Sequence, residues 1–108
     1  MLETSQTAIA DASGVATIPG FTVPTGRRRF RIASIALYVD VSAPIPEAAA
    51  YLGVVSPSAL LASRRAGDRG QLIGDSSDTY YPGQVVIVQW TNCAPGARCT
   101  ATLRGVST

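Results

Sequence analysis

The side chains that most enzymes use for proton transfer or covalent catalysis are missing from this chain. All nine basic residues are arginines, so the sequence contains neither lysine nor histidine. Histidine-dependent nucleophilic catalysis and histidine metal sites are therefore excluded, as are Schiff-base lysines and the lysine of a phosphate-binding loop. Paired carboxylates would still permit hydrolysis, but no spacing in the sequence nominates a pair. We expect a protein that is not an enzyme and that binds no cofactor.

The arginines are concentrated in two short stretches, of which the first is the denser. It contains Arg27, Arg28, Arg29 and Arg31. Neighbouring residues of a strand point to opposite faces, so these side chains cannot form one continuous row against a phosphate backbone. Because the net charge is only +2, we expect no nucleic-acid partner. The cluster is then either solvated or paired within the chain, or it contacts another subunit or an acidic protein surface.

Aromatic residues late in the chain offer a candidate carbohydrate site. The candidates are the aromatic residues Tyr80, Tyr81 and Trp90 with the polar neighbours Asp75, Asp78 and Gln89. Aromatic rings with such neighbours can stack on a sugar ring. The alternative is structural, because a tryptophan in an apolar strand usually lies in the core or at an interface, and Tyr-Tyr-Pro-Gly is typical of a packed turn.

Carboxylates and thiols are the side chains of this sequence that could bind a metal ion. Asp68, Asp75 and Asp78 carry the oxygen ligands that calcium prefers, but their spacing does not match an EF-hand loop. Solvated loop carboxylates explain them better, and we expect no metal site. Cys93 and Cys99 enclose a predicted tight turn and lack the further ligands of a structural zinc site. Their spacing fits either a disulfide or two small buried thiols.

The elements that must position these residues are mostly short strands separated by turns. The chain has 108 residues, of which 46% are apolar and 15% charged, and this indicates one globular domain. The first expected strand, 14–18, belongs to a hairpin-like region that ends near residue 26. Both alternating faces of 30–41 are largely apolar, which predicts a second cover, either within a sandwich or from another subunit.

The remaining expected elements include one short helix. Residues 48–55 and 71–73 are predicted strands, and Ser56-Pro57 is a typical start for a helix over 57–65. Residues 84–91 and 100–106 are predicted to form a hairpin around the cysteine loop. We predict an all-β fold, an antiparallel β-sandwich or jelly roll with about six to eight short strands and at most one short helix.

The first residues differ in composition from the rest of the chain. Residues 1–12 are mostly polar and uncharged, as expected of an arm that orders only against a neighbour, and residues 13–108 form the domain. The start lacks the basic and apolar regions of a secretory signal, and no stretch approaches the roughly 18 apolar residues of a membrane span. We expect synthesis in the cytoplasm and no membrane partner.

Two stretches carry a resemblance to a known family. One is Val-Pro-Thr-Gly at 23–26 with the strand 28–39, and the other is the turn and strand of 81–91 followed by Ala-Thr-Leu-Arg-Gly at 101–105. Together they resemble small jelly-roll proteins on the virion surface of tailed phages and phage-derived gene transfer agents, of the capsid decoration, head-spike or head-fibre type. Residues 60–74 have no counterpart in that pattern, and the pattern does not require the cysteine pair.

The resemblance implies a structural role on the virion surface, after synthesis in a bacterial host. The implied partners are sister subunits, in a trimer or pentamer that fits virion symmetry, and capsid or other virion proteins. The implied contact residues are residues 1–12 and the arginine cluster, with Tyr81 and Trp90 near a subunit interface. Two alternatives stay open: a host-adhesion module that binds a surface glycan, and a head–tail or tail structural component.

Overall fold

Nine β-strands and one short 3-10 helix make up the regular structure of the described residues. The computed structural model describes residues 2–22, 30–40, 46–65, 69–74, 79–80 and 83–107. In chain order the elements are β1 (Leu2–Ile9), β2 (Ala16–Thr22), β3 (Phe30–Val39), β4 (Glu47–Leu52), η1 (Pro57–Ala59), β5 (Leu60–Arg65), β6 (Arg69–Gly74), β7 (Thr79–Tyr80), β8 (Val85–Thr91) and β9 (Arg98–Ser107). The predicted all-β fold is confirmed. None of the described residues belongs to a helix that is long and apolar enough to cross a membrane.

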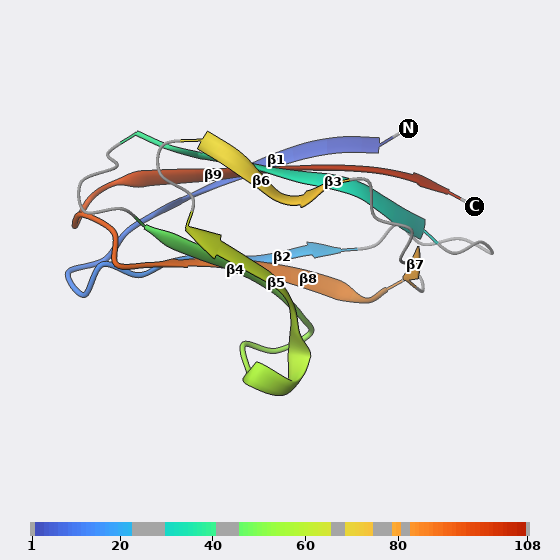
Figure 1. Cartoon of the computed structure of the whole chain (residues 1–108), viewed down its shortest axis with the longest axis horizontal. Coiled ribbons are helices and arrows are strands. Elements are labelled where there is room, and N and C mark those ends of the chain that lie inside the picture. Colours follow the sequence, from blue (N-terminus) through green and yellow to red (C-terminus); the bar gives the residue numbers. More distant parts are fainter. Residues whose placement is uncertain are drawn as a thin grey trace.

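The strands form two antiparallel sheets that face each other as a sandwich (Figure 1). One sheet has the order β1-β9-β3-β6, with β7 beside β3, and the other has the order β2-β8-β4-β5. Apart from the two-residue β7, the pairs are nested, because β1 pairs with β9, β2 with β8, β3 with β6 and β4 with β5. This nesting arises when one long antiparallel hairpin wraps around a core, which is the jelly-roll arrangement.

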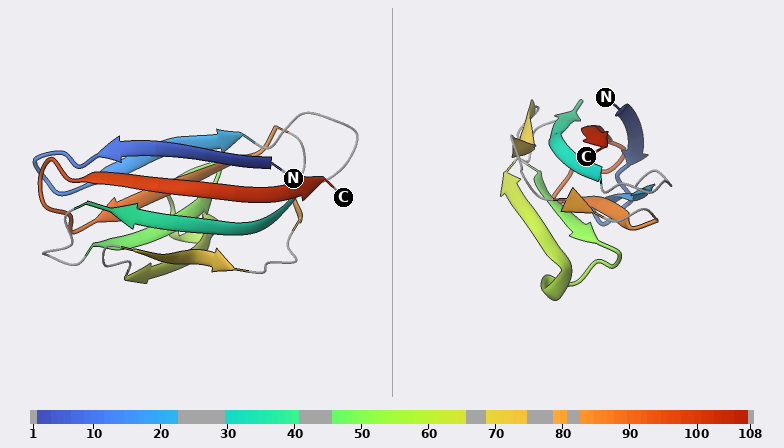
Figure 2. Two further views of the ribbon diagram at one scale, coloured as in Figure 1. Left: turned by 90° about the horizontal axis from the view of Figure 1, so that it is seen from above. Right: turned by 90° about the vertical axis from the view of Figure 1, so that its right-hand side faces the viewer.

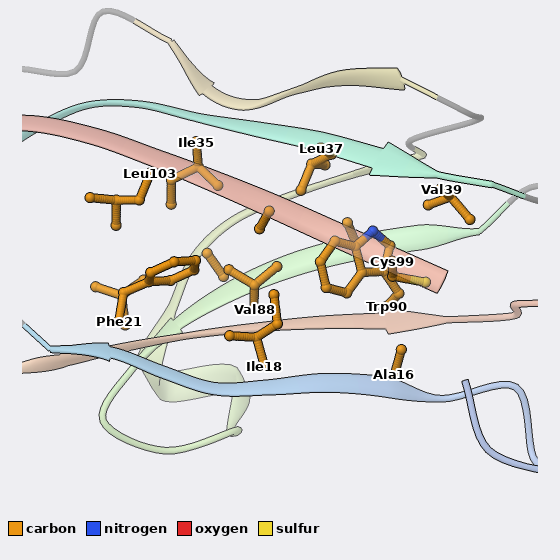
Figure 3. Packing of buried hydrophobic residues seen from close by; sticks show 14 of the residues in the cluster. Ala16, Ile18, Phe21, Ile35, Leu37, Val39, Val88, Trp90, Cys99 and Leu103 are labelled. Atoms are coloured by element: carbon orange, nitrogen blue, oxygen red, sulfur yellow. The ribbon is translucent and has the colours of Figure 1, made fainter. Parts of the chain in front are cut away.

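The core lies between the two sheets and takes large apolar side chains from both (Figure 3). On β8, Val86, Val88 and Trp90 are buried, and the residues between them are only half-buried. Ile35 and Leu103 face them from the other sheet. Burial of every second residue is what a strand with one covered face requires.

Strand β3 is buried on one face only, which corrects the prediction that it needs a second cover. Its register against β9 shifts between Ile32 and Ser34, so that Ala33 is an extra residue on β3. This bulge brings Ile32 to the same inner face as Ile35, and both are at most 1% exposed. Ile32 and Ile35, which strict alternation would place on opposite faces, therefore share the inner face.

The predicted hairpin of β8 and β9 is wrong, because these consecutive strands belong to different sheets. β8 pairs with β2 and β4, whereas β9 pairs with β1 and β3. The loop of residues 92–97 crosses between sheets, which pack about 10 Å apart in sandwiches of this kind. A hairpin and a crossing between sheets have the same strand–turn–strand pattern, so the sequence pattern does not distinguish them.

The residues predicted as a helix form a 3-10 turn followed by a strand. Ser56 caps the turn as expected, since its side chain accepts a hydrogen bond from the Ser58 N–H, and Pro57 occupies the first position. The helix ends after three residues, and β5 pairs with β4 instead. Short helices are only marginally stable in isolation, so the hydrogen bonds of a sheet edge outweigh the capping signal.

Two predictions for the N-terminal part also change. The strand predicted to end at residue 18 continues to Thr22, because β2 runs through Pro19 and Gly20 with a register shift between Ile18 and Phe21. A bulge accommodates a proline, which has no N–H to donate. The expected arm contains β1, which pairs with β9 along its whole length. This segment is therefore an edge strand of the sandwich itself.

Candidate docking surfaces and the buried cysteine pair

Short hydroxyl side chains cover part of the outer face of the sheet that contains β1 and β9. The Ser5 Oγ lies 2.8 Å from the Thr102 Oγ1, and the Thr7 Oγ1 lies 2.9 Å from the Thr100 Oγ1. Both pairs are direct cross-strand partners. Such pairs contribute about 0.2–1 kcal/mol each to the pairing of two strands. This face is therefore polar and low in relief where β1 meets β9.

One ion pair adds charge to the same face. The Arg104 Nε lies 2.7 Å from the Glu3 Oε2, and more than half of each side chain is exposed. Pairs this exposed contribute about 0–1 kcal/mol to stability. The pair therefore compensates the charge of the face more than it stabilises the fold.

The hairpin that joins β4 to β5 projects away from the sandwich (Figures 1 and 2). Val54, Val55 and Leu60 are 58%, 42% and 45% exposed. Gly53, at the base of the tip, has a φ of +83°, and its N–H donates to the Val85 carbonyl at 2.8 Å. Exposed aliphatic side chains on one projecting hairpin make this hairpin a candidate contact surface. We call Val54, Val55 and Leu60 the hairpin tip.

Trp90 is not a surface residue, which corrects two predictions for it. Its side chain is 0% exposed between the sheets, so it cannot lie at a subunit interface or stack on a sugar. Gln89, the other described member of the candidate carbohydrate site outside β7, donates through its Nε2 to the Thr17 Oγ1 at 3.1 Å. The candidate carbohydrate site therefore loses its tryptophan.

The predicted contact residues and the aspartates weighed as metal ligands lie partly outside the described structure. Arg31 is half-buried on β3, and Tyr80 belongs to β7, opposite Phe30. The predicted residues outside the described ranges are Arg27, Arg28, Arg29, Asp68, Asp75, Asp78 and Tyr81. Within the ranges that are described, no three His, Cys, Asp or Glu side chains gather as a metal-binding group.

The two cysteines meet where the β8–β9 loop crosses between the sheets. The Sγ atoms of Cys93 and Cys99 lie 3.9 Å apart, and both residues are free thiols that are at most 5% exposed. Burial raises the pKa of the Cys93 thiol. The pKa of the Cys99 thiol is raised to about 12, mainly because the thiol is buried and also because Cys93 lies beside it. The thiolate is the reactive form of cysteine, so this pair is held in its unreactive form at neutral pH.

Backbone hydrogen bonds fasten the cysteine loop to the β1–β2 loop. The Cys93 N–H donates to the Gly14 carbonyl, and the Gly96 N–H donates to the Ala10 carbonyl, both at 2.9 Å. On the other side, the Asp40 carboxylate accepts a hydrogen bond of 2.8 Å from the Arg98 N–H. The end of the sandwich that encloses the thiols is therefore closed by several elements.

We expect Cys99 to react at least about 100-fold more slowly with a thiol reagent in the reduced native protein than in urea. Burial, the largest cause of the raised pKa of Cys99, leaves far less thiolate at pH 8 than the ordinary pKa of 9.0 would, and it also limits access of the reagent. Absorbance on adding dithiobisnitrobenzoate to a Cys93→Ala variant measures the rate. Similar native and unfolded rates would contradict the burial of Cys99.

The same shift in pKa predicts how stability depends on pH. The pKa of Cys99 is higher in the folded protein than in the unfolded chain, so the neutral thiol favours the folded state. This contribution to stability is complete below the unfolded pKa of about 9 and is lost as the pH rises toward 12. Urea unfolding of the reduced protein between pH 8 and 11 should show this loss, and a Cys99→Ala variant should show less of it. Equal slopes for the two proteins would be inconsistent with the shift.

Comparisons with known proteins found no relative of this chain. No protein-family model, no curated protein and no solved structure matches it. The resemblance to phage surface proteins therefore stays a prediction from the motifs, and the described surfaces are the basis for any proposal.

Proposed function

We propose that this chain is a structural protein on the surface of a phage or phage-like particle, a capsid decoration or head-spike or fibre component. It acts by assembly of subunits and by docking to another virion protein. The observation that carries the proposal is the hairpin tip, which projects from a jelly-roll sandwich. Jelly rolls recur among capsid proteins, but a fold alone does not determine function, so the exposed hairpin tip is the feature that supports this role.

The hairpin tip has the chemistry of a small docking contact. Full burial of one aliphatic side chain contributes about 1.5–3 kcal/mol, so three of them can supply much of the energy of a specific contact. Because Val54, Val55 and Leu60 are all exposed on one hairpin, they suit an apolar pocket on the partner better than a flat polar surface. A head–tail location would use the same contact on a different virion protein.

We expect the triple variant Val54→Ser, Val55→Ser, Leu60→Ser to lose association with particles. The tagged chain is expressed in cells that encode it and release phage-like particles, which are then banded on a density gradient. The wild-type chain should band with the particles. The triple variant should band at least about ten-fold less, because each lost aliphatic contact weakens docking.

An exposed apolar residue outside both the hairpin tip and β1 provides the control. Tyr38 is 45% exposed on β3, and a Tyr38→Ser variant should band with particles like the wild type. Circular dichroism checks that all variants are folded. Absence of the wild-type chain from particles contradicts the proposed function, whereas equal banding of the triple variant contradicts the role of the hairpin tip.

A further inference from the structure

Three of the four strands at the ends of the two sheets carry features that block pairing with another chain. The described strand orders end in β1 and β6 in one sheet and in β2 and β5 in the other. β2 contains Pro19 and a register shift. The register also shifts at Leu61 on β5 and at Leu72 on β6, each of which is an extra residue. Prolines and bulges at edge strands are known barriers to edge-to-edge pairing.

Strand β1 is the regular edge. Its eight residues contain no proline and pair one-for-one with β9 without a register shift. Figure 2 shows β1 at the rim of its sheet, beside β9. Its inner-face residues Thr4, Gln6 and Ala8 are only half-buried, whereas Ala101 and Leu103 on β9 are at most 3% exposed. The burial therefore falls off at this edge, as it does where a sheet is open to an additional strand.

We propose that β1 pairs antiparallel with β1 of a second copy about a two-fold axis at Ser5. Opposite residues of an antiparallel pair lie on the same face. In this register Ser5 lies opposite its own counterpart, and Glu3 lies opposite Thr7. The Glu3 carboxylate, the one charged side chain of β1, then lies opposite the Thr7 hydroxyl, which can donate a hydrogen bond to it. No like charges face each other across the two strands.

The side chains of the outer face support the same register. Ser5 and Thr102 already form a hydroxyl pair across β1 and β9. The two-fold axis places two such pairs end to end, so the row of hydroxyls continues from one copy into the other. Small hydroxyl side chains at the axis also let the two strands approach without a steric obstacle, and the two sheets become one.

A two-fold contact differs from the trimer or pentamer that virion symmetry suggests. A closed ring of three or five subunits requires a head-to-tail contact between two different surfaces, whereas a two-fold contact uses one self-complementary surface twice. Here the one regular edge of the described sheets matches itself, and the edges available as a different partner are bulged. The edge geometry therefore favours pairs of subunits. This inference refines the assembly step of the proposed function.

Cysteine cross-linking tests the register with a matched pair of variants. Ser5 and Thr7 are both exposed on the outer face, and both make a hydroxyl pair with β9. In the proposed dimer the thiols of Ser5→Cys lie opposite each other, with Cβ atoms about 4.5–5.5 Å apart, close enough to bridge after small movements. The thiols of Thr7→Cys are four positions out of register, about 13 Å apart.

Oxidised glutathione is the oxidant: it accepts the two electrons that the two cysteine thiols lose when they form the disulfide, and it is released as two molecules of reduced glutathione. A non-reducing gel shows the covalent dimer. With Cys93 and Cys99 buried, we expect Ser5→Cys to give a covalent dimer at least about ten-fold faster than Thr7→Cys. Sedimentation equilibrium of the wild type should give twice the 11.2 kDa of one chain. A monomer at millimolar concentration, or equal cross-linking of the two variants, overturns the proposal. Neither result affects the particle experiment, which tests the proposed function separately.

Discussion

Replacement of Trp90 by alanine should lower the free energy of unfolding by about 3–5 kcal/mol, a large part of the total stability of a small domain. The indole is fully buried on the inner face of β8. Its direct neighbours on the flanking strands are Ala16 on β2 and Ala48 on β4, both almost fully buried. Small residues on both sides make room for the indole. They cannot fill the cavity that its removal would leave.

Two further variants separate this core role from a surface role. Trp90→Phe keeps most of the volume and removes an indole N–H that has no hydrogen-bond partner among the described residues, so it should lower stability by less than about 2 kcal/mol. Tyr38 is an aromatic residue that is 45% exposed, and Tyr38→Ala should change the free energy of unfolding by less than about 1 kcal/mol. Urea unfolding followed by far-ultraviolet circular dichroism measures all three. If Trp90→Ala lowered the free energy of unfolding only slightly, Trp90 would not be a core residue, and the predicted role at a surface would stand.

The β-strand pattern could be predicted from the sequence because alternating burial follows local spacing. Strands β3 and β8 lie within predicted strands, β4 begins one residue before the predicted strand and ends within it, and β9 contains a predicted strand. Two features were not predictable, since neither is local. The bulge on β3 depends on how its register fits β9, and the path from β8 to β9 depends on which sheet each strand joins. Both follow from packing between distant parts of the chain.

The candidate docking surface was missed for a related reason. Val54 and Val55 extend an apolar run that predicts a strand through residue 55, whereas β4 ends at Leu52. Gly53, which has a positive φ, follows directly and begins the projecting turn. This glycine was the available signal, but whether the two valines lie inside or outside depends on the end of β4. Trp90 shows the converse error, because an aromatic residue was assigned to a surface that its strand buries.

Replacement of Gly14 by alanine should lower the free energy of unfolding by about 3 kcal/mol or more, and Gly53→Ala by about 1–2 kcal/mol. Both glycines have a left-handed backbone, with φ values of +78° and +83°, which disfavours an L side chain by about 1–2 kcal/mol. A Cβ at Gly14 would lie 2.6 Å from the carbonyl oxygen of Cys93, whereas at Gly53 it would meet nothing within 4 Å. Only Gly14 therefore adds a backbone clash to the unfavourable φ.

The clash at Gly14 should also be visible at the cysteine pair. The Gly14 carbonyl accepts the hydrogen bond of the Cys93 N–H, so the two loops can separate only if this bond lengthens or breaks. Gly14→Ala should then expose the thiols, and dithiobisnitrobenzoate should react faster with the native variant than with native Gly53→Ala. Thermal and urea unfolding measure the stabilities. Equal losses of stability in the two variants, with unchanged thiol rates, would mean that the loops of this end are not packed against each other. A larger loss for Gly14→Ala with faster labelling would establish that the β1–β2 loop closes the site of the buried thiols.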